Sequence, residues 1–412
     1  MRLVAVVLAS ILTATLPASS QWWLAEYGFD QIQYDGTGVT VAVIDTGIDV
    51  KHPDLIGTVI DGVDFSQVGN PSGTAPVGSS SFHGTMVASL IAGQGKTSGG
   101  VIGVAPGAKL LSISIGLGVE GADTDAQIAK GVIWAVDHGA DVINLSLSRN
   151  SAVWPKSWDE AFSYAFENDV VVVAASGNRT DGSARPSAPA TMPQVIAVGG
   201  VDKSGLASDT ASTQGIGLVL VAPAEELYGS YPGGEIRSWG GSSAAAPLVS
   251  GLVALMLQKD PAATSNDIAL RLTSTVRDAG DPGFDAEYGF GIIDPGSALM
   301  ATGKAAQSPL GSLASWVELY RESQTEEKSE ALILPQEPAP IAQSGVQEPI
   351  SQAPNLPAVL ETPQQWFLNP LLYWLLSPLA PLLWIALRKR RKGESMANDQ
   401  TKVSRKHDSR DL

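Results

Sequence analysis

The sequence predicts an α/β fold in which a mostly parallel central sheet is covered by helices on both faces. Between residues 21 and 300, short β-branched or apolar runs alternate with helix-like stretches, and this alternation is typical of a parallel sheet in a three-layer domain. Of the 412 residues, 44% are apolar and 43 are glycine, which is consistent with one large, loop-rich domain with added terminal segments.

The order of the elements follows from these runs. Apolar, β-branched runs predict strands, and longer stretches with helical spacing predict the helices between them. We expect strands over residues 39–44, 109–115, 142–147, 170–175 and 195–198, and helices over 86–92, 123–138 and 156–168.

The N-terminal segment has the pattern of a secretory signal peptide. Arg2 precedes an apolar run over residues 3–16, which is too short to span a bilayer, and small residues follow at 17–20. We therefore expect residues 1–20 to be removed on secretion and residues 21–300 to form the folded domain. An N-terminal buried strand or helix is the alternative.

The composition changes at residue 301. Proline, glutamine, glutamate and serine dominate as far as residue 365, and such a segment cannot bury enough apolar surface to order itself. We expect a Pro/Gln/Glu-rich disordered stalk over 301–365, with one short helix possible at 313–320.

Residues 366–387 are uncharged and mostly apolar, and five basic residues follow at once. A helix of this length would reach about 33 Å, which is enough to cross a bilayer. The positive-inside rule places the basic tail, 388–412, in the cytoplasm and the large domain outside the cell membrane. Three prolines at 370, 378 and 381 would kink such a helix, and an apolar partner-docking helix on a soluble secreted protein is the alternative.

Charge and cysteine content exclude several classes of function. The tail carries nine basic and four acidic residues, so the remaining chain is strongly acidic within a net charge of −16. An acidic body argues against nucleic-acid binding. The chain has no cysteine, which excludes disulfides, thiolate catalysis and cysteine-bound zinc.

Three segments carry residues suited to nucleophilic catalysis. Asp45 ends a predicted strand in Asp45-Thr46-Gly47, His83 opens a helix in His83-Gly84-Thr85, and Ser243 follows a glycine in Gly241-Ser242-Ser243. Taken singly, each has a structural interpretation as a turn residue, a structural histidine or a helix cap. Together they supply an orienting carboxylate, a general base and a nucleophile.

A fourth candidate follows the apolar strand at 170–175. Asn178 stands after Ser176-Gly177, and its side-chain amide could donate a hydrogen bond to a developing oxyanion. Its alternative interpretation is a turn asparagine.

These motifs, in the order Asp, His, Ser, resemble the subtilase (subtilisin-like) family. Asp45 matches the family's Asp-Ser/Thr-Gly motif, His83 its His-Gly-Thr motif, and Ser243 its Gly-Thr-Ser-Met-Ala-x-Pro motif through Pro247. Asn178 matches the oxyanion Gly-Asn. The resemblance covers about residues 30–300 and implies a subtilisin-like serine endopeptidase with Asp45, His83 and Ser243 as its catalytic triad and Asn178 in the oxyanion hole.

By the same resemblance, Ser146, Leu147 and Ser148 should pair with an extended polypeptide substrate by strand addition. The chain departs from the family pattern at Ser242, Ala244 and Ser148. Lys96 occupies the approximate place of a calcium-ligand asparagine, so we expect the family's first calcium site to be absent although Asp54 is retained. We expect no metal and no cofactor.

The sequence of segments resembles the mycosins, subtilases associated with type VII secretion. This arrangement consists of a signal peptide, a subtilase domain, a stalk, a membrane helix and a short basic tail, without a large pro-domain. The resemblance implies a membrane-anchored extracellular endopeptidase that processes secreted proteins, with a type VII secretion complex as a partner. A catalytically silent subtilase-fold subunit that binds peptides or scaffolds such a complex is the alternative.

Overall fold

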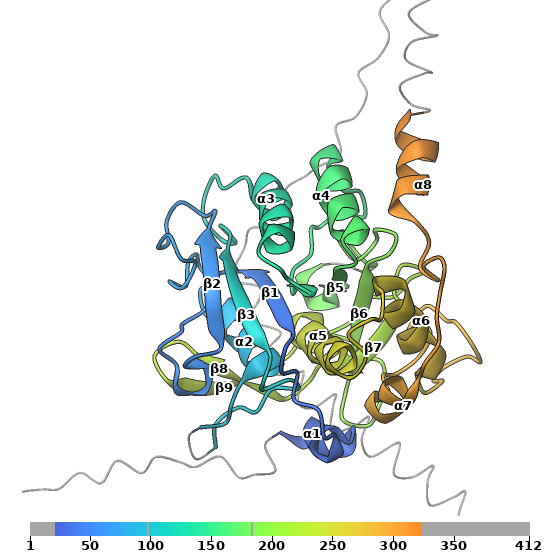
Figure 1. Ribbon diagram of the computed structural model, residues 1–412, viewed down its shortest axis with the longest axis horizontal. Helices are drawn as coiled ribbons and strands as arrows, with labels where there is room; N and C mark the ends of the chain where they lie inside the picture. Colours follow the sequence, from blue (N-terminus) through green and yellow to red (C-terminus); the bar gives the residue numbers. More distant parts are fainter. Residues whose placement is uncertain (1–20, 97–98, 183, 323–412) are drawn as a thin grey trace, which may run out of the picture. The chain divides into compact units, whose positions relative to one another are not determined.

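The computed structural model describes residues 21–322 except 97, 98 and 183. A seven-stranded sheet in the order β2-β3-β1-β4-β5-β6-β7 lies at its centre (Figure 1), and all neighbouring strands are parallel. The strands are β1 (Thr40–Asp45), β2 (Val59–Asp64), β3 (Lys109–Ser114), β4 (Val142–Leu145), β5 (Val171–Ala175), β6 (Ile196–Val201) and β7 (Leu220–Pro223).

Helices cover both faces of this sheet (Figure 1). On one face α3 (Thr124–Asp137) packs beside α4 (Lys156–Glu167), and on the other α2 (His83–Ala92) packs beside α5 (Ser242–Lys259). The expected three-layer α/β fold is confirmed.

The composition of α5 and α4 explains how much of each helix is buried. Helix α5 consists largely of small and aliphatic residues and is buried from Ala244 to Met256, because it lies against β4, β5, β6 and β7. Helix α4 buries one face, including Trp158 and Phe162, and exposes the other, as an amphipathic outer helix does.

The five predicted strands and three predicted helices are confirmed, with bounds shifted by one to three residues. The sequence analysis missed the edge strands β2 and β7 and the antiparallel hairpin of β8 (Leu227–Tyr231) and β9 (Glu235–Trp239). It also missed α6 (Ser265–Thr275) and α7 (Pro295–Met300).

The residues that follow the predicted signal peptide are docked on the domain. Helix α1 (Trp22–Glu26) places Trp23 in the core, where its ring meets Phe29 edge-on at 5.7 Å between centroids. The Lys203 ammonium lies 5.7 Å from the centre of the Trp22 ring. This segment is therefore part of the domain.

Residues 301–322 correct the expected boundary of the stalk. They continue over the domain into α8 (Leu313–Val317) and a π-helical turn (Glu318–Glu322). Leu313 is fully buried, the Trp316 ring lies 4.3 Å from that of Trp154, and Arg321 forms an ion pair with Asp159 at 2.8 Å. The short helix expected within 313–320 is therefore confirmed. One buried leucine, one aromatic contact and one ion pair order a segment that the composition of 301–365 predicted to be disordered.

The other predicted terminal segments lie outside the described residues. These are the signal peptide (1–20), the rest of the stalk (323–365), the membrane helix (366–387) and the basic tail (388–412). Within residues 21–322, no helix combines the length and apolar character that a membrane span requires.

Candidate active site

Asp45 and His83 form a hydrogen-bonded pair at the carboxyl edge of the sheet. Asp45 is the last residue of β1 and is fully buried, and His83 is the first residue of α2. The His83 Nδ1 atom lies 3.0 Å from Oδ1 and 2.9 Å from Oδ2 of the carboxylate. The Thr46 N–H also donates to Asp45 Oδ1, at 2.7 Å. The carboxylate therefore fixes the orientation of the imidazole.

The environment of His83 sets its proton affinity. Burial lowers the pKa of His83, but the charge of Asp45 and its hydrogen bond outweigh that effect, and the net pKa is raised above the ordinary 6.5. The side chain keeps about 20% of its surface exposed, so one edge of the ring is accessible from the solvent side.

Ser243 is the second residue of α5, the helix that packs against α2. Its hydroxyl donates to the carbonyl of Ser146 at 2.9 Å, and among the described residues no hydrogen bond joins it to His83. Catalytic hydrogen bonds are often formed only in the substrate complex. A rotation of the Ser243 hydroxyl away from Ser146 is therefore the change that the site needs.

The adjacent serine has a different environment. Ser242 is fully buried, its hydroxyl accepts the Gly177 N–H at 3.1 Å, and it donates to Asn178 Oδ1 at 3.0 Å. Both contacts are structural, and Ser243 is the partly exposed serine of the two. The geometry favours Ser243 as the nucleophile, as the sequence predicts.

Asn178 follows β5 and is held at both ends of its side chain. Oδ1 accepts the Ser242 N–H at 2.8 Å, and Nδ2 donates to the Asp181 carboxylate at 2.8 Å. A primary amide has two N–H groups, so one remains for another acceptor. The contact with Asp181 was not foreseen from the sequence, although Asp181 is only three residues away.

Gly241 is required because the start of α5 approaches Asn178 closely. Its φ of 118° is disfavoured for residues with a side chain, and a Cβ atom there would lie 3.2 Å from Asn178 Oδ1. Its N–H donates to the Ala224 carbonyl at 2.8 Å. This glycine lets the start of α5 lie against Asn178.

The predicted substrate-binding residues follow β4 directly. The pairing of β4 with β5 ends at Leu145 and Ala174, and Ser146, Leu147 and Ser148 continue beyond the sheet. Ser146 and Leu147 are buried and Ser148 is exposed. The Ser146 carbonyl accepts the hydrogen bond from the Ser243 hydroxyl, so this segment borders Ser243.

Sequence reasoning missed Trp239, the last residue of β9. Its ring meets His83 edge-on, with centroids 5.5 Å apart and planes at 87°. An aromatic residue two positions before Gly241 was the available signal. Trp239 shields one side of the imidazole and contributes to its desolvation.

Asp54, which the resemblance assigns to the family's first calcium site, is fully buried, and its Oδ1 atom has no hydrogen-bond partner among the described residues. Asp54 Oδ2 accepts the Val101 N–H at 2.8 Å and the Ser230 hydroxyl at 3.0 Å. The Lys96 ammonium donates to the Ile56 carbonyl at 2.9 Å, which places a positive charge in the loop after α2. Within the described part of the chain, no three potential ligands among His, Asp and Glu gather as a metal site would need.

Comparison with known proteins agrees with the resemblance to the subtilases. The profile of the subtilase family matches residues 36–291. Subtilisin DY of Bacillus licheniformis is 36% identical over 272 residues, which is 64% of this chain and 93% of the relative. Fervidolysin of Fervidobacterium pennivorans is 37% identical over 311 residues, 68% of this chain, and the chain spans only 43% of that protein's length.

Among solved structures, MycP1 from the ESX-1 type VII secretion system matches with a TM-score of 0.59 at 28% identity, covering 72% of this chain and 90% of MycP1. The fold and the family profile agree over the domain that carries Asp45, His83, Asn178 and Ser243. The chain therefore belongs to the subtilase family.

Proposed function

We propose that this protein is a serine endopeptidase that hydrolyses polypeptides through an acyl-enzyme, with Asp45, His83 and Ser243 as its triad. The observation that carries the proposal is the pair of hydrogen-bond distances, 2.9 and 3.0 Å, between the buried Asp45 carboxylate and His83 Nδ1. This contact leaves Nε2 free to act as general base.

In the first step Ser243 Oγ attacks the scissile carbonyl carbon while His83 Nε2 takes its proton. The resulting tetrahedral intermediate collapses when His83 delivers that proton to the leaving amine, and an ester to Ser243 remains. Water, deprotonated by His83, then hydrolyses this ester and regenerates the serine. Asp45 stabilises the imidazolium in both steps.

The oxyanion of each intermediate is bound by the free N–H of Asn178 and the backbone N–H of Ser243. Asn178 is suited to this role because Ser242 and Asp181 already fix its orientation. A preorganised donor costs no reorganisation when the charge develops.

The substrate segment before the scissile bond binds along Ser146, Leu147 and Ser148. These residues extend β4 past its last paired residue, so an extended peptide can add as a further strand. The Ser146 carbonyl releases the Ser243 hydroxyl when the substrate enters.

The proposed setting is the outer face of a cell membrane. The apolar segment 366–387 followed by basic residues supports a single-pass anchor with a cytoplasmic C-terminus, and residues 1–20 support secretion. The similarity to MycP1 from a type VII secretion system supports a role in processing secreted proteins beside such a complex.

Labelling of the full chain with a fluorophosphonate probe tests the catalytic proposal. We expect labelling of the wild type and of Ser242→Ala, and complete loss in Ser243→Ala. Loss only in Ser242→Ala would assign the nucleophile to the other serine. Absence of labelling in folded wild-type protein would refute hydrolysis and favour a silent peptide-binding or scaffold subunit.

Carbonate extraction of membranes from cells that express the full chain tests the anchor. We expect the protein to stay in the membrane pellet, and a variant that ends after residue 365 to be released. Release of the full chain into the supernatant would refute anchoring by residues 366–387.

A further inference from the structure

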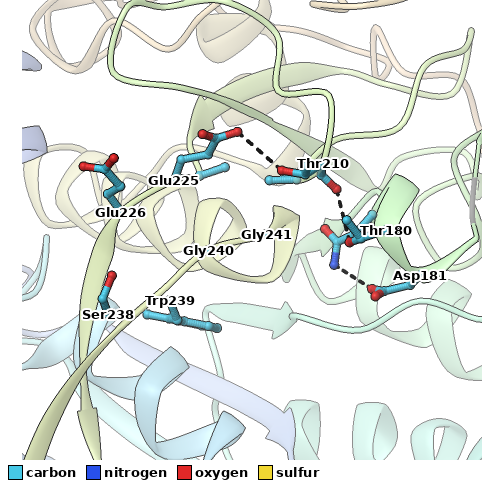
Figure 2. Close-up of a pocket in the computed structure, with 12 residues that line it drawn as sticks. Thr180, Asp181, Thr210, Glu225, Glu226, Ser238, Trp239, Gly240 and Gly241 are labelled. Atoms are coloured by element: carbon cyan, nitrogen blue, oxygen red, sulfur yellow. Dashed lines mark hydrogen bonds between the residues drawn. The ribbon is translucent and has the colours of Figure 1, made fainter. Parts of the chain in front are cut away.

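A cavity of about 450 Å³ opens beside the catalytic residues. Figure 2 shows its lining, which comes from the loops after β5, β6 and β7, from the end of β9 and from the turn before α5. Asn178 and Gly241, which flank the oxyanion position, are part of its wall. A cavity of this size lies in the range of ligand-binding pockets, so it can hold a side chain of a substrate.

The position of this pocket indicates which part of the substrate it binds. The segment Ser146–Ser148 follows β4, whereas the pocket loops follow β5, β6 and β7, which lie in that order on the side of β5 away from β4. Trp239 lines the pocket and also touches His83, the residue that protonates the leaving amine. The pocket therefore lies on the leaving-group side of the scissile bond, an assignment that rests on the proposed function.

The charge of the pocket is negative. Three of its lining residues, Asp181, Glu225 and Glu226, are acidic. Figure 2 shows the two glutamates on one side and Asp181 on the other. Such a wall attracts cations and repels anions.

Neighbouring basic residues compensate only part of this charge. Lys203 forms an ion pair with Glu226 at 2.6 Å, and Arg179 pairs with Asp209 at 3.3 Å, outside the pocket lining.

Two carboxylates of the pocket are not paired with a basic side chain. Within the described residues, neither Asp181 nor Glu225 has a basic partner. Glu225 accepts hydrogen bonds from the hydroxyls of Ser208 and Thr210, which fix the position of its carboxylate and are neutral donors. Glu225 is partly buried, so a cation beside it is less screened by water than one at an exposed carboxylate.

We propose that this pocket binds a lysine or arginine side chain immediately after the scissile bond, and that Glu225 is its principal charge partner. The enzyme thus selects substrates with a basic residue at the new N-terminus that cleavage creates. Glu225 is a specificity-determining residue, because it contacts the leaving group's side chain and none of the reacting atoms.

The test uses the full chain and three fluorogenic peptides that differ only at the residue after the scissile bond, with the cleavage position confirmed by mass spectrometry of the products. These residues are lysine, acetyl-lysine and alanine. We expect kcat/KM to be about fivefold higher for lysine than for alanine, and acetyl-lysine, which keeps the length and loses the charge, to resemble alanine.

The matched variants are Glu225→Gln and Glu167→Gln, the latter at the exposed end of α4. Glu225→Gln should bring the lysine-to-alanine ratio close to one, and Glu167→Gln should keep the wild-type ratio. A wild-type ratio of one, an equal preference for acetyl-lysine, or an unchanged ratio in folded Glu225→Gln would each overturn the inference. Failure of the wild type to cleave any of the peptides would instead overturn the proposed function, and this inference with it.

Discussion

The Asn178 side-chain amide donates to the Asp181 carboxylate over 2.8 Å. Its oxygen is held from the other side by the Ser242 N–H. The amide can therefore rotate in neither direction without losing a contact. In the proposed mechanism Asp181 would act on the reaction through the orientation of Asn178, as a positioning residue.

Replacing Asn178 by alanine should lower kcat by about 10²- to 10³-fold and leave KM nearly unchanged, because the lost hydrogen bond exists only in the transition state. This magnitude is the one established for the corresponding oxyanion-hole asparagine of subtilisin, a member of the same family. Steady-state kinetics with an alanine peptide would measure it. A rise in KM at constant kcat would show instead that Asn178 binds the ground state.

Asp181→Ala should lower kcat about fivefold with the same alanine peptide, which corresponds to the net value of about 1 kcal/mol for one hydrogen bond. KM should change little. Asp181→Asn, whose side-chain oxygen can still accept the amide proton, should recover most of the loss. If Asp181 competed with the oxyanion for the amide proton, Asp181→Ala would raise kcat.

The pH dependence of kcat/KM should show an acid limb governed by His83, since only the neutral imidazole accepts the serine proton. Burial lowers the pKa of His83 and Asp45 raises it by more, so the midpoint should lie above 6.5.

In Asp45→Asn the charge that raises the pKa is gone. The acid limb of the residual activity should therefore move to lower pH while kcat falls on the order of 10⁴-fold. A midpoint that stayed in place would mean that another group titrates in this range.

Asp267 should make the stability of the domain depend on pH. Burial raises the pKa of Asp267, but the N–H groups of Thr264 and Ala305, with the Lys304 ammonium at 3.0 Å, hold it far below the ordinary 3.8. Stabilisation by a carboxylate with a lowered pKa is present above its unfolded-state value and is lost as pH falls towards the folded-state value.

Asp267→Asn should therefore lower the free energy of unfolding at pH 7 by about 1–3 kcal/mol, and the difference from wild type should shrink below about pH 4. Denaturant titrations across this pH range would measure both values. Asp281→Asn, at an exposed position, is the control. A difference that is constant with pH would show that the ionised form is not what stabilises the native state.

Leu313→Ala should destabilise the domain by about 2–4 kcal/mol, because Leu313 is fully buried although it lies beyond residue 300. Leu206→Ala, at a position 62% exposed, should cost much less. Thermal unfolding of the two variants would compare them directly. Equal midpoints would mean that α8 contributes no packing energy.

The sequence predicted the elements whose residues are consistently buried, or buried along one face. The strand at β5 reads as an unbroken apolar run because it is buried on both faces. The edge strand β2 is partly exposed and contains Asp61 and Gly62, so its pattern carries neither an apolar run nor a strict alternation. Edge position, rather than weak strand formation, explains why it was missed.

At the site, the motifs predicted that residues far apart in the sequence, such as Asp45 and His83, lie in contact. They could not predict contacts that depend on side-chain rotamers, such as the bond from Asn178 to Asp181 or the edge-on contact of Trp239 with His83. They also could not show that Leu313 finds a buried site within a polar segment, because burial of one leucine depends on the tertiary surface that receives it.

Helix α5, which begins with Ser242 and the proposed nucleophile Ser243, lies against four strands of the sheet and is buried over most of its length. The nucleophile cannot leave its place without pulling this helix out of the core. Amide protons in the middle of α5 should therefore exchange with solvent only when the whole domain unfolds. The enzyme should keep its catalytic geometry up to the temperature at which it melts, and lose activity and tertiary structure in a single step.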